Sequence, residues 1–220
     1  SGSQSIARHR SHTQTQRNKI MYPAGNSFWV CRGSDIEPVF LEDAGHGQQP
    51  QRDTALRYVN KFDHCLDIGS NVGQWTRPLK QRFKKVDCFE PNPMFRECFT
   101  RNIPLDNVQL HPYGLSDRPH TASQVFNQTV LKDAPGDIEC RTLDSYNFTD
   151  IDFIKIDVDG FEIPLLEGAR KTLQTNSAVI NIEMKTDKRP SIVARAVTIL
   201  QSVGYRRVSR VKSDEVWLKS

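Results

Sequence analysis

The sequence predicts an α/β fold, with a mostly parallel sheet of seven strands and helices on both of its faces. Two observations support this prediction. From Asp53 onward, short apolar segments alternate with amphipathic ones, which is typical of βαβ units. The chain then ends in two strand-like segments, 205–210 and 215–219, on either side of the polar turn Lys212-Ser213-Asp214. These two segments can only form a hairpin, and doubly wound sheets accept an antiparallel hairpin at an edge.

The first 50 residues have a different character. Residues 1–34 contain no acid and five basic side chains, whereas the rest of the chain has 25 basic and 26 acidic residues; the five are Arg8, Arg10, Arg17, Lys19 and Arg32. This arm is either a solvated tail or a segment that binds phosphates, which makes nucleic acid one partner to consider. We expect short strands at 27–31 and 38–41 to form a cap, with a polar linker at 43–51. We therefore divide the chain into an arm and cap, 1–50, and a main domain, 51–220.

The main domain is expected to alternate strands and helices. Five parallel strands are predicted, at 64–68, 86–89, 108–112, 152–158 and 178–184. Helices are predicted at 54–60, 74–83, 94–102, 163–174 and 192–203, and the last of them should end at Gly204 as a C-cap. Segments 121–125 and 137–143 are predicted to be strands of an excursion.

A glycine-bearing turn, Gly69-Ser70-Asn71-Val72-Gly73, follows the first predicted strand of the main domain. Glycine has no Cβ to keep a ligand away from backbone amides, so Gly69, Ser70, Asn71 and Gly73 are predicted to contact a ligand. A dinucleotide fingerprint would need a glycine where Asn71 stands. The turn therefore favours S-adenosylmethionine (SAM) over a dinucleotide cofactor.

Two acids extend this predicted cofactor site. Asp67, at the end of the first strand, suits the ammonium group of SAM. Glu90 follows 23 residues later at the end of the second strand, where an acid can accept hydrogen bonds from both ribose hydroxyls. The prolines that flank Asn92 fix the path of the chain after Glu90, so Pro91 and Asn92 join the predicted contacts. Ser116 and Asp117 follow the third strand, where they either reach the adenine or form a simple polar turn.

Residues for catalysis are expected at the ends of the fourth and fifth strands. Strand alternation places Lys155 and Asp157 on one face, and Asn181, Glu183 and Lys185 on one face of the next strand. Methylation of a hydroxyl needs a positioned base. Asp157, which is also a predicted cofactor contact, is our first choice for the base or substrate anchor, and Glu183 is the second. Lys155 and Glu183 are expected to pair across the two strands, in catalysis or as a structural ion pair.

Taken in order, these motifs resemble the FkbM family of methyltransferases. The resemblance covers roughly residues 62–185 and rests on five blocks: 67–73, 89–93, Thr142-Leu143-Asp144, 152–162 and 165–169. It implies a class I methyltransferase (Rossmann-like) fold and SAM-dependent O-methylation, often of a hydroxyl on a sugar or natural product. Asp159 stands where the family has a glutamate, and the first 50 residues match no known pattern, so we expect substrate choice to reside there.

Two other functions fit parts of the sequence. A nucleic-acid 2′-O-methyltransferase, acting on an RNA cap or ribose, would use a Lys-Asp-Lys-Glu set, for which Lys61, Asp157, Lys185 and Glu215 are the available residues. The register is unfavourable, because Lys61 lies very close to the first strand and Lys185 lies at the end of its own. The other rival is a binding module that kept the fold without catalysis.

The cysteines indicate the compartment. All five are scattered, with no pair at metal-binding or redox spacing, and Cys65 and Cys88 are predicted to be small apolar residues of strands. No apolar run approaches the roughly 20 residues that cross a bilayer. We therefore expect a soluble protein of the reducing cytoplasm, and assign no metal ligand.

Overall fold

The computed structural model describes residues 21–24, 27–43, 48–124, 131–132, 134–185 and 189–220. Most of the basic arm, residues 1–20, and the middle of the expected linker, residues 44–47, lie outside this part of the chain.

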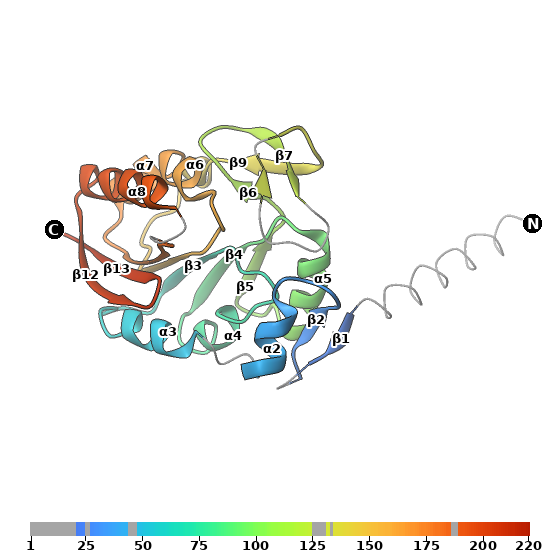
Figure 1. Ribbon diagram of the computed structural model, residues 1–220. Helices are drawn as coiled ribbons and strands as arrows, with labels where there is room; N and C mark the ends of the chain where they lie inside the picture. The colour runs from blue at the N-terminus through green and yellow to red at the C-terminus, as the bar shows by residue number, and fades with distance from the viewer. Residues whose placement is uncertain (1–20, 25–26, 44–47, 125–130, 133, 186–188) are drawn as a thin grey trace, which may run out of the picture.

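A seven-stranded sheet forms the centre of the molecule (Figure 1), as predicted. Its order is β12-β13-β11-β10-β3-β4-β5. The five strands from β11 to β5 are parallel, and the C-terminal hairpin β12-β13 pairs with β11 in the antiparallel direction. The strands are β3 His64–Ile68, β4 Lys85–Phe89, β5 Val108–His111, β10 Phe153–Ile156, β11 Val179–Glu183, β12 Tyr205–Val211 and β13 Asp214–Lys219.

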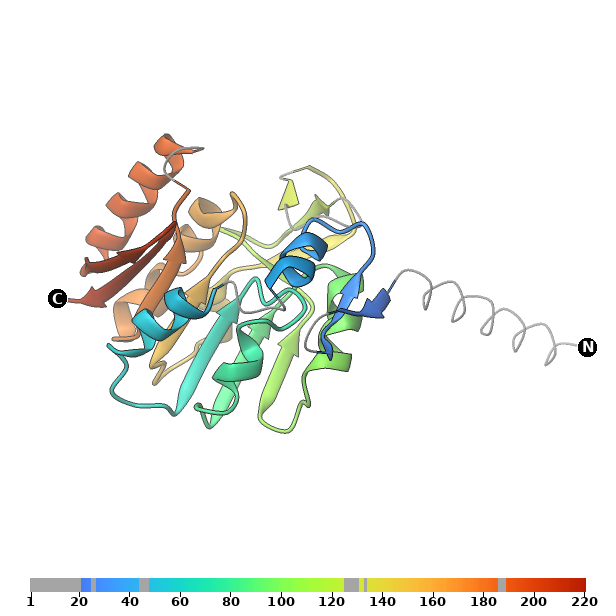
Figure 2. The ribbon, with the colours of Figure 1, turned by 60° about the horizontal axis from the view of Figure 1, so that its bottom comes forward.

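Helices cover both faces of the sheet, as Figures 1 and 2 show. On one face lie α6 Glu162–Glu167, α7 Arg170–Thr175 and α8 Pro190–Ser202. On the other lie α3 Gln49–Leu56, α4 Thr76–Leu79 and α5 Pro93–Asn102. Gly204, with φ of +87°, ends α8 in the left-handed conformation expected of a C-cap glycine. No helix in the described part of the chain has the length and apolar character needed to span a membrane.

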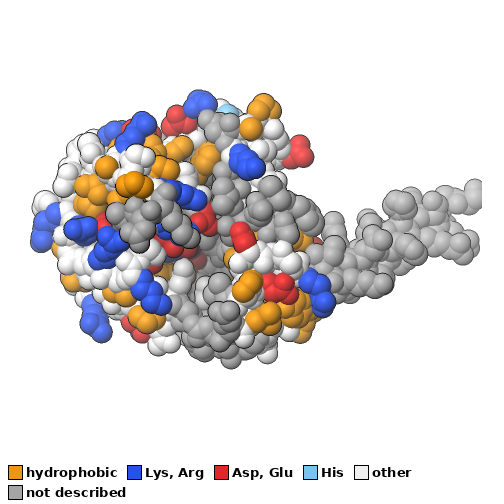
Figure 3. Space-filling model, viewed as in Figure 1, with side chains coloured by type: hydrophobic (Ala, Val, Ile, Leu, Met, Phe, Trp, Pro, Cys, Tyr) orange, Lys and Arg blue, Asp and Glu red, His pale blue; other side chains and the backbone are white. Residues whose placement is uncertain are grey.

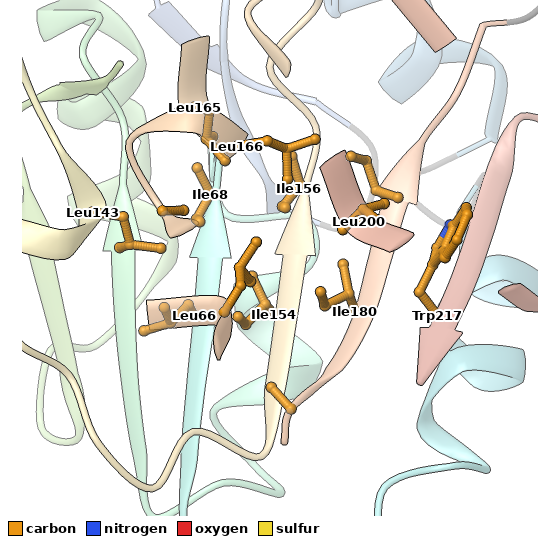
Figure 4. Close-up of a cluster of buried hydrophobic side chains, with 14 of the residues drawn as sticks. Leu66, Ile68, Leu143, Ile154, Ile156, Leu165, Leu166, Ile180, Leu200 and Trp217 are labelled. Atoms are coloured by element: carbon orange, nitrogen blue, oxygen red, sulfur yellow. The ribbon is translucent and has the colours of Figure 1, made fainter. Parts of the chain in front are cut away.

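The face under α6, α7 and α8 is apolar at its centre (Figure 4), and the buried polar residues His64, Asp87 and Glu215 lie around this centre. Strand residues such as Ile68, Ile156 and Ile180 meet Leu166 and Leu200 of the helices there, and all five are buried. Burial of each such side chain is worth about 1.5–3 kcal/mol. This face therefore anchors the sheet and leaves ligand binding to the other one.

The opposite face changes from apolar to polar along the strands. Near the amino ends of its strands, residues such as Cys65 and Val179 pack under α3 and α4. Two residues further along β3, β10 and β11 come Asp67, Lys155 and Asn181, which lie side by side in register. The sheet thus presents its polar residues at the carboxyl ends of the strands, where ligands of open α/β sheets bind.

The expected cap strand at 38–41 is wrong, since these residues belong to the helix α2 Glu37–Asp43. A short apolar run fits either structure by periodicity alone. Pro38 suits the first turn of a helix, and the Glu37 carboxylate accepts hydrogen bonds from Gly33 N (2.6 Å) and the Tyr22 hydroxyl (2.5 Å). The expected strand at 27–31 appears as β2 Trp29–Cys31, paired with β1 Met21–Pro23, which the sequence did not predict.

Three helices also differ from prediction. Helix α4 covers only Thr76–Leu79 of the expected range 74–83. Helix α3 begins at Gln49, inside the expected linker, because Pro50 is a favourable first-turn residue. The helix expected over 163–174 is split into α6 and α7 at Gly168. A Cβ at Gly168 would lie 1.9 Å from the carbonyl oxygen of Ser116, so the chains approach too closely for any other residue.

The excursion between β5 and β10 forms a small four-stranded sheet with the order β6-β9-β7-β8. Its strands are β6 Gly114–Leu115, β7 His120–Gln124, β8 Leu131–Lys132 and β9 Ile138–Arg141, followed by the 3-10 helix η2 Leu143–Tyr146. The two strands predicted here correspond to β7 and β9.

The cap packs on α5 through one polar residue and an apolar cluster. Asn102 accepts a hydrogen bond from Trp29 N (2.6 Å) and donates to the carbonyl oxygens of Trp29 (3.0 Å) and Val72 (2.8 Å). Phe40 of α2 and Cys31 of β2 are buried in the same cluster as α5. The cap is therefore fixed beside the glycine turn.

Candidate functional site

A cavity of about 570 Å³ opens at the carboxyl ends of β3, β4, β10 and β11. Acidic side chains are visible in the recess near the middle of the face drawn in Figure 3. The charged residues that line the cavity are Asp35, Glu90, Lys155, Asp157, Asp159, Glu183, Lys185 and Arg189. Its other walls include the turn residues Gly69, Ser70 and Asn71, and the apolar side chains Ile36, Phe40, Trp75, Tyr113, Leu115 and Phe161.

The glycine turn forms one wall of the cavity and depends on a glycine at position 69. Gly69 has φ of +77°, and a Cβ there would lie 1.8 Å from the carbonyl oxygen of Asp157. Asn71 is also left-handed, with φ of +52°. Its backbone N–H therefore points to Glu90 and donates to Glu90 Oε2 over 2.9 Å.

Glu90 lies at the end of β4 with both carboxylate oxygens held. Oε1 accepts from the backbone N–H of Asn92 (2.7 Å), and Oε2 accepts from that of Asn71. Burial raises the pKa of Glu90 to about 7, although these two amides and Arg96 oppose the rise. Each carboxylate oxygen retains a further lone pair for a donor from a ligand.

Asp67 and Lys155 form an ion pair beneath the cavity. Asp67 is fully buried, accepts a hydrogen bond from Thr76 Oγ1 (2.6 Å) and lies 3.3 Å from Lys155 Nζ. Lys155 also donates to the carbonyl oxygen of Gly69 (2.7 Å). Burial alone would lower the pKa of Lys155, but Asp67 and Asp157 outweigh it and raise the pKa above its usual value. Lys155 thus stabilises the glycine turn through its hydrogen bond to Gly69.

The expected pairing of Lys155 with Glu183 is wrong. Lys155 pairs instead with Asp67 on β3 and, at 3.9 Å, with Asp157, while Glu183 pairs with Lys185 at 2.8 Å. Lys155 lies level with Asn181 in the β10–β11 register, and Glu183 comes two residues further along β11. The lysine is therefore nearer to Asp67, which is directly opposite it on β3.

A cluster of three acids lies at the ends of β10 and β11. Carboxylate oxygens of Asp157, Asp159 and Glu183 all lie within 4.8 Å of one another, a spacing that could hold a cation. Lys185 already supplies a positive charge there, since its Nζ contacts both Asp159 and Glu183. Burial and the nearby Asp157 raise the pKa of Glu183 to about 7. Glu183 is thus suited to exchange a proton near neutral pH.

Five predicted contacts do not line the cavity: Asp67, described above, and the four residues Gly73, Asn92, Ser116 and Asp117. Gly73 packs against Ile103, whose Cγ1 would lie 2.6 Å from a Cβ at this position. Asn92 caps α5 by accepting from Met94 N (2.9 Å). Ser116 lies against Gly168, and Asp117 pairs with Arg118 at 3.0 Å. Ser70, Pro91 and the other predicted contacts except Asp67 line the cavity.

The cap supplies cavity residues that sequence reasoning missed. Ile36 and Phe40 of the cap line the cavity, and Trp75 Nε1 donates to the side chain of Gln48 at its rim. Arg189, just before α8, was also missed. No local signal marked these residues, because their proximity depends on tertiary contacts across the chain.

The Lys-Asp-Lys-Glu set of the ribose methyltransferase alternative is not assembled. Lys61 is exposed and lies just before the amino end of β3, whereas the cavity is at the carboxyl ends of the strands. Glu215 faces Ile182 in the β11–β13 register and pairs with Arg207 at 2.7 Å. Since neighbouring residues of a strand point to opposite faces, Glu215 lies on the face away from Glu183.

The buried ion pair beneath the turn leads to a stability prediction. Lys155→Met should lower the free energy of unfolding by about 3–5 kcal/mol, because it leaves Asp67 charged and unpaired in the interior. The double variant Lys155→Met/Asp67→Asn should recover part of this loss. Urea unfolding followed by circular dichroism measures both. Equal losses in the single and double variants would contradict the ion-pair assignment.

Comparisons with known proteins identify the family and the fold of this chain. The sequence profile of the Methyltransferase FkbM domain matches residues 67–207. No curated protein matches the chain significantly. Among solved structures, the chain is similar to a methyltransferase FkbM from Methylobacillus flagellatus, with a TM-score of 0.50 and 14% identity over 83% of this chain and 60% of that one. The chain thus spans only 60% of the length of that protein.

In two further solved structures, the match covers a larger share of the other chain. A putative methyltransferase from Streptococcus mutans, in complex with SAH, has a TM-score of 0.51 and 15% identity over 77% of this chain and 94% of that one. An rRNA methylase from Streptococcus thermophilus has a TM-score of 0.51 and 14% identity over 78% and 94%. At this identity the structures establish a shared class I methyltransferase fold. Because the family profile extends over well more than half of the sequence, this chain belongs to the FkbM methyltransferase family.

Proposed function

We propose that this chain is a SAM-dependent O-methyltransferase that methylates a hydroxyl of a sugar, glycan or small natural product. One observation carries the proposal: Glu183, an acid whose pKa is raised to about 7, lines the same cavity as the glycine turn and Glu90. A proton acceptor thus lies near a nucleoside-binding turn, as transfer to a hydroxyl requires.

The residues of the turn fit SAM. Glu90 retains lone pairs for the ribose hydroxyls, and the absence of a Cβ at Gly69 brings backbone close to the cavity. When bound, SAM supplies a methyl group on a positively charged sulfur. Asp157 is the acid that we assign to its ammonium group, because Asp157 lines the cavity whereas Asp67 is fully buried and engaged with Thr76 and Lys155.

Glu183 is our choice for the general base, in place of Asp157, which the sequence alone favoured. The order β4, β3, β10, β11 across the sheet places Glu90, Gly69, Asp157 and Glu183 in a row. A cofactor held by Glu90 and Asp157 would lie over β4, β3 and β10. Glu183, at the end of β11, then lies beyond the cofactor, on the side of the cavity that we call the acceptor side. Lys185, 2.8 Å from Glu183, orients the carboxylate.

The cap is proposed to select the acceptor. Residues 1–50 would form the arm and cap of the methyltransferase domain 51–220, and Asp35, Ile36 and Phe40 of the cap line the cavity. We also propose a cytoplasmic location, since all five cysteines are free and buried, as in proteins of reducing compartments.

A methyl-transfer screen tests the proposed reaction. Label from SAM should appear in saccharides or in small phenols and alcohols, and Glu183→Gln should slow the transfer by at least about 100-fold. Label only in capped RNA would favour the nucleic-acid alternative. Tight SAM binding without transfer to any acceptor would favour the non-catalytic module.

The pH dependence of the reaction follows from Glu183. A general base acts when deprotonated, so kcat at saturating substrates should fall about tenfold per pH unit below pH 7 and level off above it. Initial rates between pH 5.5 and pH 9 measure this profile. A profile that is flat through pH 7 would speak against Glu183 as the base.

A further inference from the structure

We infer that the acceptor carries an anionic group, a carboxylate, phosphate or sulfate, which Arg189 binds beside the hydroxyl that is methylated. This inference rests on the proposed function and deepens it by naming the charge of the acceptor.

Arg189 is the cavity cation that lacks a protein partner in the described part of the chain. Its Nη1 atom is buried without a hydrogen-bond partner, and Arg189 takes part in no ion pair among the described residues. The other two cavity cations are engaged, Lys155 with Asp67 and Lys185 with Glu183. A buried charged donor without an acceptor is costly, so the position favours a ligand that supplies one.

The fold fixes where this guanidinium lies. A Cβ at Gly160 would lie 2.7 Å from Nη1 and 3.1 Å from Cζ of Arg189, so the guanidinium packs directly against the loop that follows β10. The backbone N–H of Arg189 donates to the carbonyl oxygen of Lys185 (2.9 Å), just after β11. Arg189 therefore lies over the ends of β10 and β11.

This position is on the acceptor side of the proposed site. Glu90 is on β4, and the sheet order separates β4 from β11 by β3 and β10. Under the proposed function, Asp157 on β10 binds the ammonium end of the cofactor. A group bound by Arg189 would then lie on the β11 side of that end. The planar guanidinium presents paired N–H donors that match two oxygens of a carboxylate, phosphate or sulfate.

The start of α8 adds to this preference. Helix α8 has 13 residues, begins directly after Arg189, and has no side-chain cap at its first turn. The positive end of its dipole therefore lies next to the guanidinium and favours an anion there.

The nearby acids do not cancel this preference. Lys185 contacts both Asp159 and Glu183 and balances part of their charge. Asp157 lies 3.9 Å from Lys155 and, under the proposed function, faces the ammonium group of the cofactor. The guanidinium of Arg189 is thus left as the group that an acceptor anion can neutralise.

Titration with matched probes tests the inference. Methyl glucuronoside and methyl glucoside differ only at C6, which is a carboxylate in the first and a hydroxymethyl group in the second. Inorganic phosphate and sulfate represent the other anions. In the SAH-loaded protein, at least one anionic probe should bind saturably and at least tenfold more tightly than methyl glucoside. Arg189→Gln should remove that difference. The control Arg195→Gln, at a 65% exposed side chain on α8 that lies 3.6 Å from Glu167, should behave as the wild type.

SAM titration of the same proteins separates the possible outcomes. Arg189→Gln should leave the Kd for SAM within twofold of the wild-type value. A loss of SAM affinity equal to the loss for the anionic probes would assign Arg189 to the cofactor carboxylate and overturn the inference. Absence of saturable anion binding in the wild type, or equal binding in Arg189→Gln, would overturn it too. Failure of SAM to bind would instead refute the proposed function, and the anion titrations of the ligand-free protein would still decide the role of Arg189.

Discussion

Glu183→Gln is expected to lower kcat for methyl transfer by about 10²–10⁴-fold, the usual contribution of a positioned general base. The amide keeps the shape of the side chain but cannot take the proton of the acceptor hydroxyl. Because Glu183 lies on β11, away from Glu90 on β4, the Kd for SAM should change by less than about threefold. Single-turnover methyl transfer and calorimetric SAM titration measure the two effects separately.

A matched control is available on the surface of α6. Glu167→Gln removes a carboxylate that pairs with Arg170 at 2.6 Å and does not line the cavity, so its kcat should equal the wild-type value. Wild-type kcat in Glu183→Gln would show that another group accepts the proton, and Asp157 would become the candidate.

Gly69→Ala should destabilise the protein and abolish tight SAM binding. The new methyl group would lie 1.8 Å from the carbonyl oxygen of Asp157, which is backbone and cannot rotate away. Left-handed strain of about 1–2 kcal/mol and overpacking of about 1–3 kcal/mol together predict a loss of about 2–5 kcal/mol. Urea unfolding measures the stability, and the Kd for SAM should rise at least tenfold as the turn shifts.

Gly33→Ala separates the two causes of this loss. Gly33 has φ of +70°, close to that of Gly69, but no atom of the described residues lies within 4 Å of the place that a new methyl group would take. Its substitution should therefore cost only the conformational strain, about 1–2 kcal/mol, and leave SAM affinity unchanged. Equal losses in the two variants would show that the contact with Asp157 is unimportant.

The sequence was sufficient to predict the central sheet and the glycine turn. The strands that end at Ile68, Phe89 and Glu183 are short, mostly buried segments with few polar residues, set between helical patterns, which gives a strong signal without tertiary information. A dinucleotide-binding turn needs a glycine at the position of Asn71, so this one residue was enough to disfavour a dinucleotide cofactor. Local pattern and fold agree in this region.

The remaining features depend on contacts between distant segments. Lys155 was predicted to pair with Glu183, yet it pairs with Asp67 because the strand register brings that residue directly opposite. The helix at Pro38 was predicted as a strand, since a short apolar run does not distinguish the two. Arg189 enters the site through the packing of its guanidinium on the loop at Gly160, which strand and helix patterns do not encode.

Calorimetric titration with SAM tests the central claim most directly. The wild type should bind one SAM per chain and show no heat with NAD, because Asn71 replaces the glycine that a pyrophosphate requires. Glu90→Ala should weaken SAM binding at least tenfold, since a hydrogen bond to a charged group contributes about 1.5–3 kcal/mol. A folded wild-type protein that does not bind SAM, or a Glu90→Ala variant that binds it with unchanged affinity, would contradict the assignment of this cavity as the cofactor site.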